Sequence, residues 1–380
     1  MGRQAVIHCD KLQGNIQRIK SVLPTDVGII AVVKGEAYGH GLRAMSKELS
    51  MNKNIKMLAV SSLEEARAIA TVRQDILIMY PVYTSVIKRM MENDGMDECK
   101  KILEEKVIFT VGSAFEYKVY KELATQLGIK FRVHLRLDFQ GGVRGFSKKE
   151  FNDNYEYMLE EDELRVCGLY AHVYSTYTED TKAKKKDLEE YANCFNSLDP
   201  KYRNRLMVHM LTSPSFEEFP EYSFDAVRVG AAIYGMPTGY KKSTLNLECV
   251  MSISANIVNI VEENEGKSLD YTGQTRNITK VGLLPIGNWD IPHFFRGKEC
   301  HLRVNGVLTT LAGEACMDTC CVDVSNVPNV AVGDTVYFLD EQPGITFEEK
   351  MKENGYSMSD CQMLYGGAGR LPKIYESKEV

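Results

Sequence analysis

A lysine ends an apolar run near the start of the chain. Residues 28–33 are apolar and predict a buried strand, which places Lys34 at the strand end. The ammonium group of a buried lysine resists desolvation, so it needs a partner or a chemical role. One such role is attack on a carbonyl group to form a Schiff base. The ordinary alternative is a lysine whose charged head reaches solvent at the end of a strand.

The segment that follows favours the chemical role. Residues 38–41 read Tyr-Gly-His-Gly, so two glycines allow close approach of the backbone to a ligand, and Tyr38 adds a hydroxyl. The stretch at residues 31–41 resembles the cofactor-lysine signature of the alanine racemase family, whose members use pyridoxal phosphate. The resemblance implies that Lys34 carries this cofactor as a Schiff base and that Tyr38 binds its phosphate.

The resemblance extends over nearly the whole chain. Further segments similar to family motifs are Gly-Leu-Tyr-Ala-His at 168–172, His-Met-Leu-Thr-Ser at 209–213, Arg-Val-Gly-Ala-Ala-Ile-Tyr-Gly at 228–235, Leu-Asp-Tyr at 269–271, Cys-Met-Asp at 316–318 and Arg-Leu-Pro-Lys at 370–373. In the second of these, Thr212 stands where the family usually has asparagine. Together these segments imply a complete cofactor and substrate site.

The resemblance implies how the cofactor is held. Ser213 and the backbone amides of Gly230 and Ala231 would complete the phosphate site, which loops after the last barrel strands often form. Arg228 would face the pyridine nitrogen and, because it only donates, would keep that nitrogen unprotonated. Arg144 would contact a cofactor oxygen and the substrate. The cofactor ring would then withdraw electrons weakly, which suits removal and return of a single proton.

Racemisation needs a proton-transfer group on each face of the substrate. The resemblance implies Lys34 on one face and Tyr271, supplied by a partner subunit, on the other. A tyrosine hydroxyl is a weak base unless a neighbour stabilises its phenolate, a role that His172 would fill with Arg228 and His209 behind it. Taken singly, Tyr271 would more commonly be an ordinary tyrosine of a strand, and His172 and His209 would more commonly be histidines of the core.

Three further positions depart from the family pattern. Arg136 replaces a barrel lysine that is often carbamylated, and an extra residue within 139–143 blurs the local alignment around Arg144. Asn288 and Gly369 each stand where the family usually has a tyrosine near the substrate entrance. The loss of two rings is expected to change the lining of that entrance, and with it the choice of substrate.

The substrate contacts that the resemblance implies are Arg144, Met317, Asp318 and Asn288. An asparagine both donates and accepts hydrogen bonds, so Asn288 could pair with a substrate hydroxyl. We therefore expect serine to be handled at least comparably to alanine.

The elements that position these residues begin with an alternating pattern. Lys34, Asp138, His172, Ser213 and Arg228 fall at or just past the ends of strand-like runs, where barrel enzymes keep their active sites. Eight such runs alternate with helical stretches such as 62–70 and 113–127, which predicts a (β/α)8 barrel, with an open doubly wound sheet as the alternative. The runs are residues 28–34, 57–60, 76–80, 107–111, 131–138, 166–174, 206–212 and 224–229.

After about residue 240 the pattern changes to strand-like runs without helices between them, at residues 247–262, 279–286, 300–304, 307–311, 320–324 and 335–339. Asn-Gly at 305–306 predicts a hairpin turn. We expect residues 1–240 to form the barrel and residues 241–380 to form a mostly β domain with one helix near 346–354. The resemblance implies that residues 1–10 pair with this second domain.

The composition fits a soluble globular protein. Hydrophobic residues make up 44% of the 380 residues, charged residues 26%, and the net charge is −6 with Lys and Arg dispersed, which argues against nucleic-acid binding. No apolar run approaches the roughly 20 residues that span a bilayer. The ten cysteines and seven histidines show no metal-ligand spacing. We expect a cytoplasmic protein without a metal site, either whole or as the cytosolic part of a longer membrane protein.

Three interpretations compete. The first is a homodimeric amino-acid racemase with shared active sites, acting on alanine or serine and similar to the serine racemases of vancomycin resistance. The second is a barrel-type decarboxylase with the same cofactor, but such enzymes prefer a glutamate opposite the pyridine nitrogen, and Arg228 argues against it. The third is a non-catalytic protein that binds pyridoxal phosphate on the barrel alone, and the β domain carrying Tyr271 argues against that.

Overall fold

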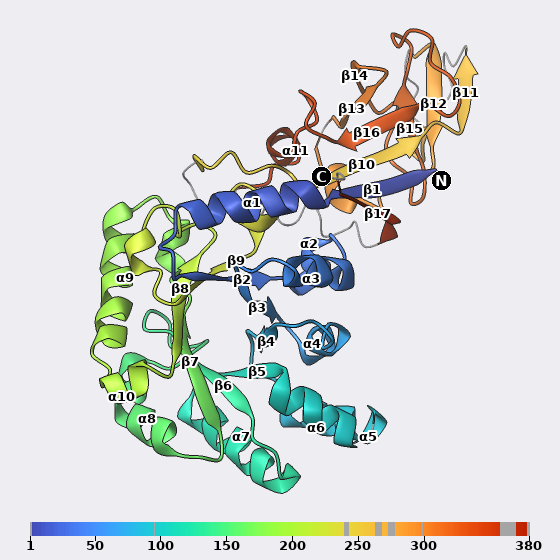
Figure 1. The fold of residues 1–380 in the computed structure, drawn as a ribbon. Coiled ribbons are helices and arrows are strands. Elements are labelled where there is room, and N and C mark those ends of the chain that lie inside the picture. The colour runs from blue at the N-terminus through green and yellow to red at the C-terminus, as the bar shows by residue number, and fades with distance from the viewer. Residues whose placement is uncertain are drawn as a thin grey trace.

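The computed structural model describes residues 2–94, 96–238, 243–262, 268–272, 278–297, 299–357 and 370–377. Gly369 and the expected domain boundary at residue 240 lie outside these ranges. Figure 1 shows a strand barrel with helices outside it and a β-rich part at one end of an elongated molecule. The N-terminal strand lies in the β-rich part, and helix α1 leads from it to the barrel.

Eight parallel strands close into a barrel in the order β2 to β9, and β9 pairs with β2. The closure confirms the expected barrel and excludes the open sheet. The strands are β2 (Gly28–Val32), β3 (Ile55–Val60), β4 (Asp75–Ile78), β5 (Val107–Val111), β6 (Arg132–Leu137), β7 (Arg165–Ala171), β8 (Met207–Thr212) and β9 (Ala226–Val229).

Helices surround the barrel strands in Figure 1. The two helical stretches given above as examples both begin with a serine cap: the Oγ atoms of Ser62 and Ser113 accept hydrogen bonds from backbone N–H groups of the first turn. The helices along this part of the chain are α1 (Cys9–Ser21), α3 (Leu42–Ser50), α4 (Leu63–Ala68), α5 (Thr84–Asp94), α6 (Met96–Glu105), α7 (Ala114–Leu127), α8 (Lys148–Glu160), α9 (Thr181–Asn196) and α10 (Pro200–Arg203).

The β-rich part contains two sheets. A six-stranded sheet has the order β14-β13-β16-β10-β1-β17, and a three-stranded sheet has the order β11-β12-β15. The strands are β1 (Arg3–His8), β10 (Met251–Asn256), β11 (Asn259–Glu262), β12 (Lys280–Leu284), β13 (His301–Val304), β14 (Val307–Thr310), β15 (Cys320–Asp323), β16 (Thr335–Leu339) and β17 (Lys373–Glu376).

The prediction of one long strand at residues 247–262 is wrong. Residues 247–262 do not form a single strand, because the chain passes from one sheet to the other between β10 and β11. Ile257 N–H donates to Asp334 O at 2.9 Å, whereas Val258 N–H donates to Leu283 O at 2.9 Å. The expected turn is present: Asn305 and Gly306 have positive φ angles of 48° and 78° and join β13 to β14.

The N-terminal strand is an inner strand of the larger sheet. β1 pairs antiparallel with β10 on one side and parallel with β17 on the other. Residues from both ends of the described chain therefore complete one sheet.

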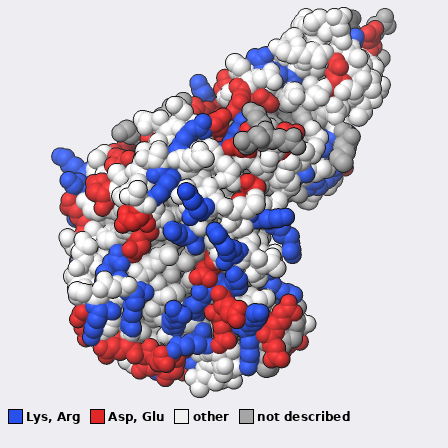
Figure 2. Space-filling model, in the orientation of Figure 1, with Lys and Arg blue, Asp and Glu red and all other residues white. Residues whose placement is uncertain are grey.

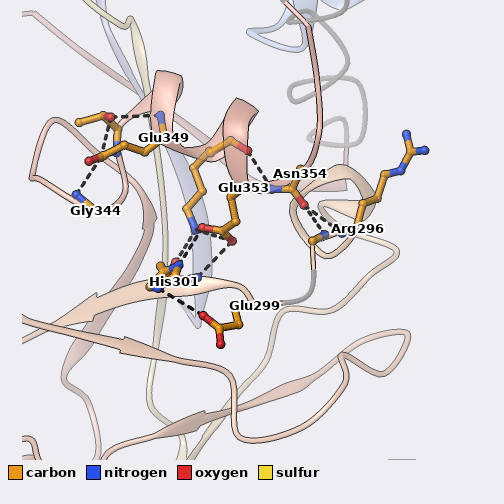
Figure 3. A network of polar contacts seen from close by, with 10 residues as sticks. Arg296, Glu299, His301, Gly344, Glu349, Glu353 and Asn354 are labelled. Carbon is orange, nitrogen blue, oxygen red and sulfur yellow. Dashed lines mark hydrogen bonds and ion pairs between the residues drawn. The ribbon is translucent and has the colours of Figure 1, made fainter.

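A buried polar cluster fastens helix α11 (Phe347–Glu353) to this sheet. Lys350 is fully buried; its ammonium group donates to the backbone oxygen of His301 and lies 3.2 Å from a carboxylate oxygen of Glu353. The side chain of Asn354, at the helix end, accepts hydrogen bonds from the N–H group of Arg296 at 2.9 Å and from the next residue (Figure 3). The helix is thus held at its C-terminal end.

The surface carries charges of both signs. Figure 2 shows Lys and Arg interspersed with Asp and Glu over the barrel face in view. No helix in the described part of the chain is both long and apolar enough to cross a membrane.

Candidate active site

A cavity of about 360 Å³ lies at the C-terminal ends of the barrel strands. Eight of the residues expected in the site line it: Lys34, Tyr38, Arg144, His172, Ser213, Arg228, Gly230 and Ala231. His209 is fully buried and is not part of the lining. No Asp or Glu is among the lining residues, so the cavity presents cations, hydroxyl groups and backbone amides.

Lys34 follows β2 in an unusual backbone segment. The expected strand at 28–34 ends at Val32, and the short helical turn α2 (Lys34–Tyr38) contains residues with positive φ, including Glu36 at 56° and Ala37 at 53°. Left-handed backbone is unfavourable for residues other than glycine, and it occurs most often at functional sites. A carboxylate oxygen of Glu65 accepts from Gly35 N–H at 2.7 Å and helps to hold the segment.

The hydroxyl and amide groups expected to hold a phosphate lie together. Ser213 Oγ accepts hydrogen bonds from Gly230 N–H at 3.1 Å and from Ala232 N–H at 3.4 Å. A side chain at residue 230 would overlap the hydroxyl group of Tyr38, so a glycine is required for this approach. The amide of Ala232 therefore joins that of Gly230 at the serine, and Ala231, expected to donate to a phosphate, lines the cavity beside them.

A hydrogen-bonded chain runs inward from Arg228. Its guanidinium donates to His209 Nδ1 at 2.8 Å, and His209 Nε2 lies 3.1 Å from His134 Nδ1. An arginine can only donate, so His209 Nδ1 must accept and His209 Nε2 must carry the proton. That proton is donated to His134 Nδ1. The chain therefore has one direction and requires both histidines to be neutral.

The electrostatics agree with this assignment. Burial, with the neighbouring Arg132 and Arg228, lowers the pKa of His134 to about 3. Burial also lowers the pKa of His209 well below its usual value. Burial lowers the pKa of Arg228 to about 10, which leaves the guanidinium charged at neutral pH.

His172 faces the cavity beside the same arginine. Arg228 donates to Ala171 O at 2.9 Å, and the same nitrogen lies 3.5 Å from His172 Nδ1. Burial, followed by the charges of Arg228 and Arg136, lowers the pKa of His172 to about 3. With Nδ1 accepting from the guanidinium, the proton of the neutral ring lies on Nε2, which is available as a donor.

Other lining residues were missed by the sequence analysis. Tyr170, whose ring centroid lies 4.8 Å from the Arg228 guanidinium carbon, is buried in the cavity wall. Tyr174 accepts hydrogen bonds from both Arg136, at 3.0 Å, and Arg144, at 3.3 Å. The signal for Tyr170 was its spacing, two residues before His172, because alternate residues of a strand share a face.

A third missed residue, His134, is buried and does not line the cavity. His134 lies two residues before Arg136 on β6, and both side chains are buried. Arg136, expected only to differ from the family pattern, lines the cavity.

Four expected site residues do not line this cavity: Tyr271, Asn288, Met317 and Asp318. All four lie in the β-rich part. The side chain of Tyr271 is 91% exposed and that of Met317 is 52% exposed.

Hydrogen bonds link the segments that carry these four residues. Asp270 accepts from Glu314 N–H at 2.6 Å, and the Asn288 side chain donates to Ala315 O at 3.2 Å. Trp289 N–H donates to the backbone oxygen of Met317 at 3.1 Å. The segments that carry these four residues therefore form one exposed surface of the β-rich part.

The arrangement can hold an anionic, aromatic ligand beside a lysine amine. Donors for a phosphate, a buried guanidinium and a neutral histidine surround one cavity. In the described residues, no three His, Cys, Asp or Glu side chains are grouped so as to hold a metal ion.

Comparisons with protein families agree over most of the chain. The model described as the alanine racemase N-terminal domain matches residues 7–237, and the model described as the alanine racemase C-terminal domain matches residues 250–375.

Individual proteins align over nearly their full length. Alanine racemase 2 of Caldanaerobacter subterraneus is 27% identical over 97% of this chain and 93% of its own. The structure of alanine racemase from Clostridium difficile 630 has a TM-score of 0.84 at 22% identity and covers 100% of this chain and 96% of that one. The Bartonella henselae enzyme, solved with covalently bound pyridoxal phosphate, has a TM-score of 0.81 at 18% identity, covering 99% and 100%. These structures share the fold.

Proposed function

The chain belongs to the alanine racemase family, and from this premise we propose that it is a pyridoxal-phosphate-dependent isomerase that racemises a small amino acid. The observation that carries the proposal is one cavity lined by Lys34, Arg228, His172 and the group formed by Ser213 and Gly230. A lysine amine, a fixed cation and phosphate donors are the parts that this cofactor needs from a protein.

The residues present fit the cofactor. Tyr38, Ser213 and the amide of Gly230 meet at one place because residue 230 has no side chain. When bound, pyridoxal phosphate supplies an aldehyde for an amine and a ring that stabilises negative charge at the substrate Cα. Arg228, held by its bonds to His209 and Ala171, would donate to the ring nitrogen.

The protein's own groups would move the proton. We propose that the Lys34 amine removes or returns the Cα proton on one face of the substrate. On the other face, Tyr271 of a second subunit would act, and the Nε2–H group of His172 would stabilise its phenolate. The bond from Arg228 to His172 Nδ1 supports this orientation of the ring.

We propose a homodimer with shared sites, and the position of Tyr271 supports it. Its side chain is 91% exposed and it does not line the cavity of its own chain. Mixing inactive Lys34→Ala and Tyr271→Phe chains should restore part of the activity, because one hybrid site regains both groups. Lack of recovery after demonstrated subunit exchange would contradict shared sites.

We propose alanine or serine as the substrate, with Arg144, Met317, Asp318 and Asn288 as contacts. A polar group that pairs with a substrate hydroxyl discriminates better than pocket volume, which contributes only about 1–3 kcal/mol per methylene. The ratio of kcat/KM for serine to that for alanine should fall in Asn288→Tyr. An unchanged ratio, or a strong preference of the native protein for alanine, would remove Asn288 from this role.

We also propose a division into a barrel at 1–240 and a second domain at 241–380. The match to the first family model ends at residue 237 and the match to the second begins at residue 250, which supports this division. A cytoplasmic location is also proposed, and the described cysteines, all free thiols, support it.

The decisive test is exchange of the Cα proton. The purified protein with pyridoxal phosphate, incubated with L-alanine or L-serine in heavy water, should give the D-form with deuterium at Cα. Borohydride reduction and peptide mapping should place the cofactor on Lys34. Release of carbon dioxide instead would indicate a decarboxylase, and a label on another lysine would contradict the assignment of Lys34.

A further inference from the structure

Two guanidinium groups meet at one hydroxyl group in the cavity wall. Arg136 of β6 and Arg144 of the following loop both donate to Tyr174 Oη, at 3.0 and 3.3 Å. Arg136 is only 6% exposed, whereas Arg144 is exposed. A neutral phenol hydroxyl does not compensate two positive charges.

No carboxylate in the described part of the chain forms an ion pair with either arginine. The charge of Arg136 acts on the carboxyl groups of Asp138 and Glu116, where it favours the ionised form. Asp138 accepts from the backbone N–H groups of Gly141 and Arg144. Glu116 accepts from the N–H group of residue 112. Both carboxylates therefore serve the backbone, and neither lines the cavity.

The surroundings of Arg136 leave donors unused. Its guanidinium carbon lies 5.8 Å from the ring centroid of Tyr80 and 5.9 Å from that of Tyr170. Among the described residues, it donates hydrogen bonds only to Met79 O, at 3.4 Å, and to Tyr174 Oη, and its buried Nε atom has no partner there. A guanidinium has five N–H donors arranged in a plane, so several remain for a planar acceptor.

The position of Arg136 relative to Lys34 indicates where in the cavity a bound anion would lie. The Lys34 amine lies 5.9 Å from the centroid of the same Tyr80 ring that Arg136 contacts. The groups suited to phosphate lie on other loops, around Ser213 and Gly230. An anion at the two arginines would therefore lie on the Tyr80 side of the cavity, next to the reacting amine.

We propose that Arg136, together with Arg144 and the hydroxyl of Tyr174, binds a planar oxyanion, and that this site receives the α-carboxylate of the amino acid. The assignment of this anion as the substrate carboxylate rests on the proposed function, whereas the binding of a planar oxyanion does not. A free small carboxylate has the same chemistry and would occupy the site in the absence of substrate. Arg136 is then a substrate-binding residue whose in-plane donors match a carboxylate.

Binding can be measured without turnover. The protein carrying its cofactor is titrated calorimetrically with sodium formate, which has a carboxylate but no amine, in a buffer of constant ionic strength. We expect saturable binding that weakens at least tenfold in Arg136→Gln and less in Arg136→Lys. Arg165→Gln, which removes an equal charge from an exposed position at the start of β7, should bind formate as the native protein does.

Kinetics then separate the two sources of the anion. If the substrate carboxylate is the ligand, formate competes with the amino acid and Arg136→Gln raises KM more than it lowers kcat. If a free anion is the ligand, formate does not compete and raises the activity of the native protein only. Equal formate affinity in native protein and Arg136→Gln, or no binding to the native protein, overturns the site. Formate binding without any racemisation would contradict the proposed function and leave the site intact.

Where Arg136→Gln does not give the native circular dichroism spectrum, Arg136→Lys decides the result. A lysine keeps the charge but not the planar set of donors, so the geometry proposed here requires a measurable loss of formate affinity. Unchanged affinity in that variant would contradict a planar guanidinium site.

Discussion

Acid should destabilise this protein through three buried neutral histidines. His40, His134 and His209 are each at most 1% exposed. Burial lowers the pKa of His40 and that of His134 to about 3, and it lowers the pKa of His209 well below its usual value. His172 also has a low pKa, but it faces the cavity, so its contribution to stability depends on the bound ligand.

The magnitude follows from proton linkage. An unfolded histidine has a pKa of about 6.5, so below that pH the unfolded chain binds protons that the folded protein does not. The contribution of these groups to stability is complete above pH 6.5 and is lost as the pH falls toward 3. At pH 5 each histidine lowers the free energy of unfolding by about 2 kcal/mol relative to neutral pH, and the three together lower it by about 6 kcal/mol. Between pH 5 and 6 the free energy of unfolding should change by about 4 kcal/mol.

The assay is urea unfolding followed by circular dichroism between pH 5 and 8. The slope of unfolding free energy against pH reports the difference in bound protons, whatever the absolute stability. In His134→Gln the slope should fall by about 1.4 kcal/mol per pH unit, the share of one proton. Leu77→Ala, which weakens the barrel interior without removing a titrating group, should keep the native slope.

Two results would refute this reasoning. A nearly flat dependence of native stability between pH 5 and 6.5 would mean that the buried histidines bind protons in the folded state. An unchanged slope in His134→Gln would mean that His134 is not the neutral acceptor at the end of the chain from Arg228.

Other variants test packing around the site and in the second sheet. Gly168→Ala should cost about 2–5 kcal/mol in urea unfolding, because the new methyl group overlaps the His134 ring; unchanged stability would mean that the ring moves freely. Lys350→Ala should lower stability by about 3–5 kcal/mol, since a buried ion pair loses one partner, and a loss below about 1 kcal/mol would contradict that role. Gly230→Ala should weaken pyridoxal phosphate binding roughly tenfold or more in an absorbance titration by displacing Tyr38, and native affinity would count against the phosphate site.

The sequence was sufficient to predict the barrel because its signal is local. Apolar runs alternated with helical spacing, and polar residues followed the runs, which placed Lys34 and Arg228 at one end of the strands. The left-handed segment after Lys34 could not be predicted. Glu36 and Ala37 have no residue-specific preference for positive φ, and contacts such as that of Glu65 with Gly35 hold them there.

Long-range partners explain the other differences. The break near residue 257 depends on Asp334 and Leu283, which are far away in sequence, so the run at 247–262 gave no sign of two strands. His134 was missed because a single histidine in an apolar strand has no distinctive pattern until its partner His209 is known. The surface around Tyr271 needs a second subunit, which one sequence does not describe.

The inner position of β1 has a consequence for how the chain folds during synthesis. Ile7 pairs with Met251, so the first strand has no antiparallel partner until about 240 more residues have been made. At roughly 5–20 residues per second, that wait is on the order of ten to fifty seconds. During this time the whole barrel can emerge and fold, while β1, with Ala5 and Ile7 that are buried in the finished fold, stays unpaired. A nascent chain of this protein should therefore expose β1 to chaperones for longer than any barrel strand, and deleting β1 should prevent the larger sheet from closing.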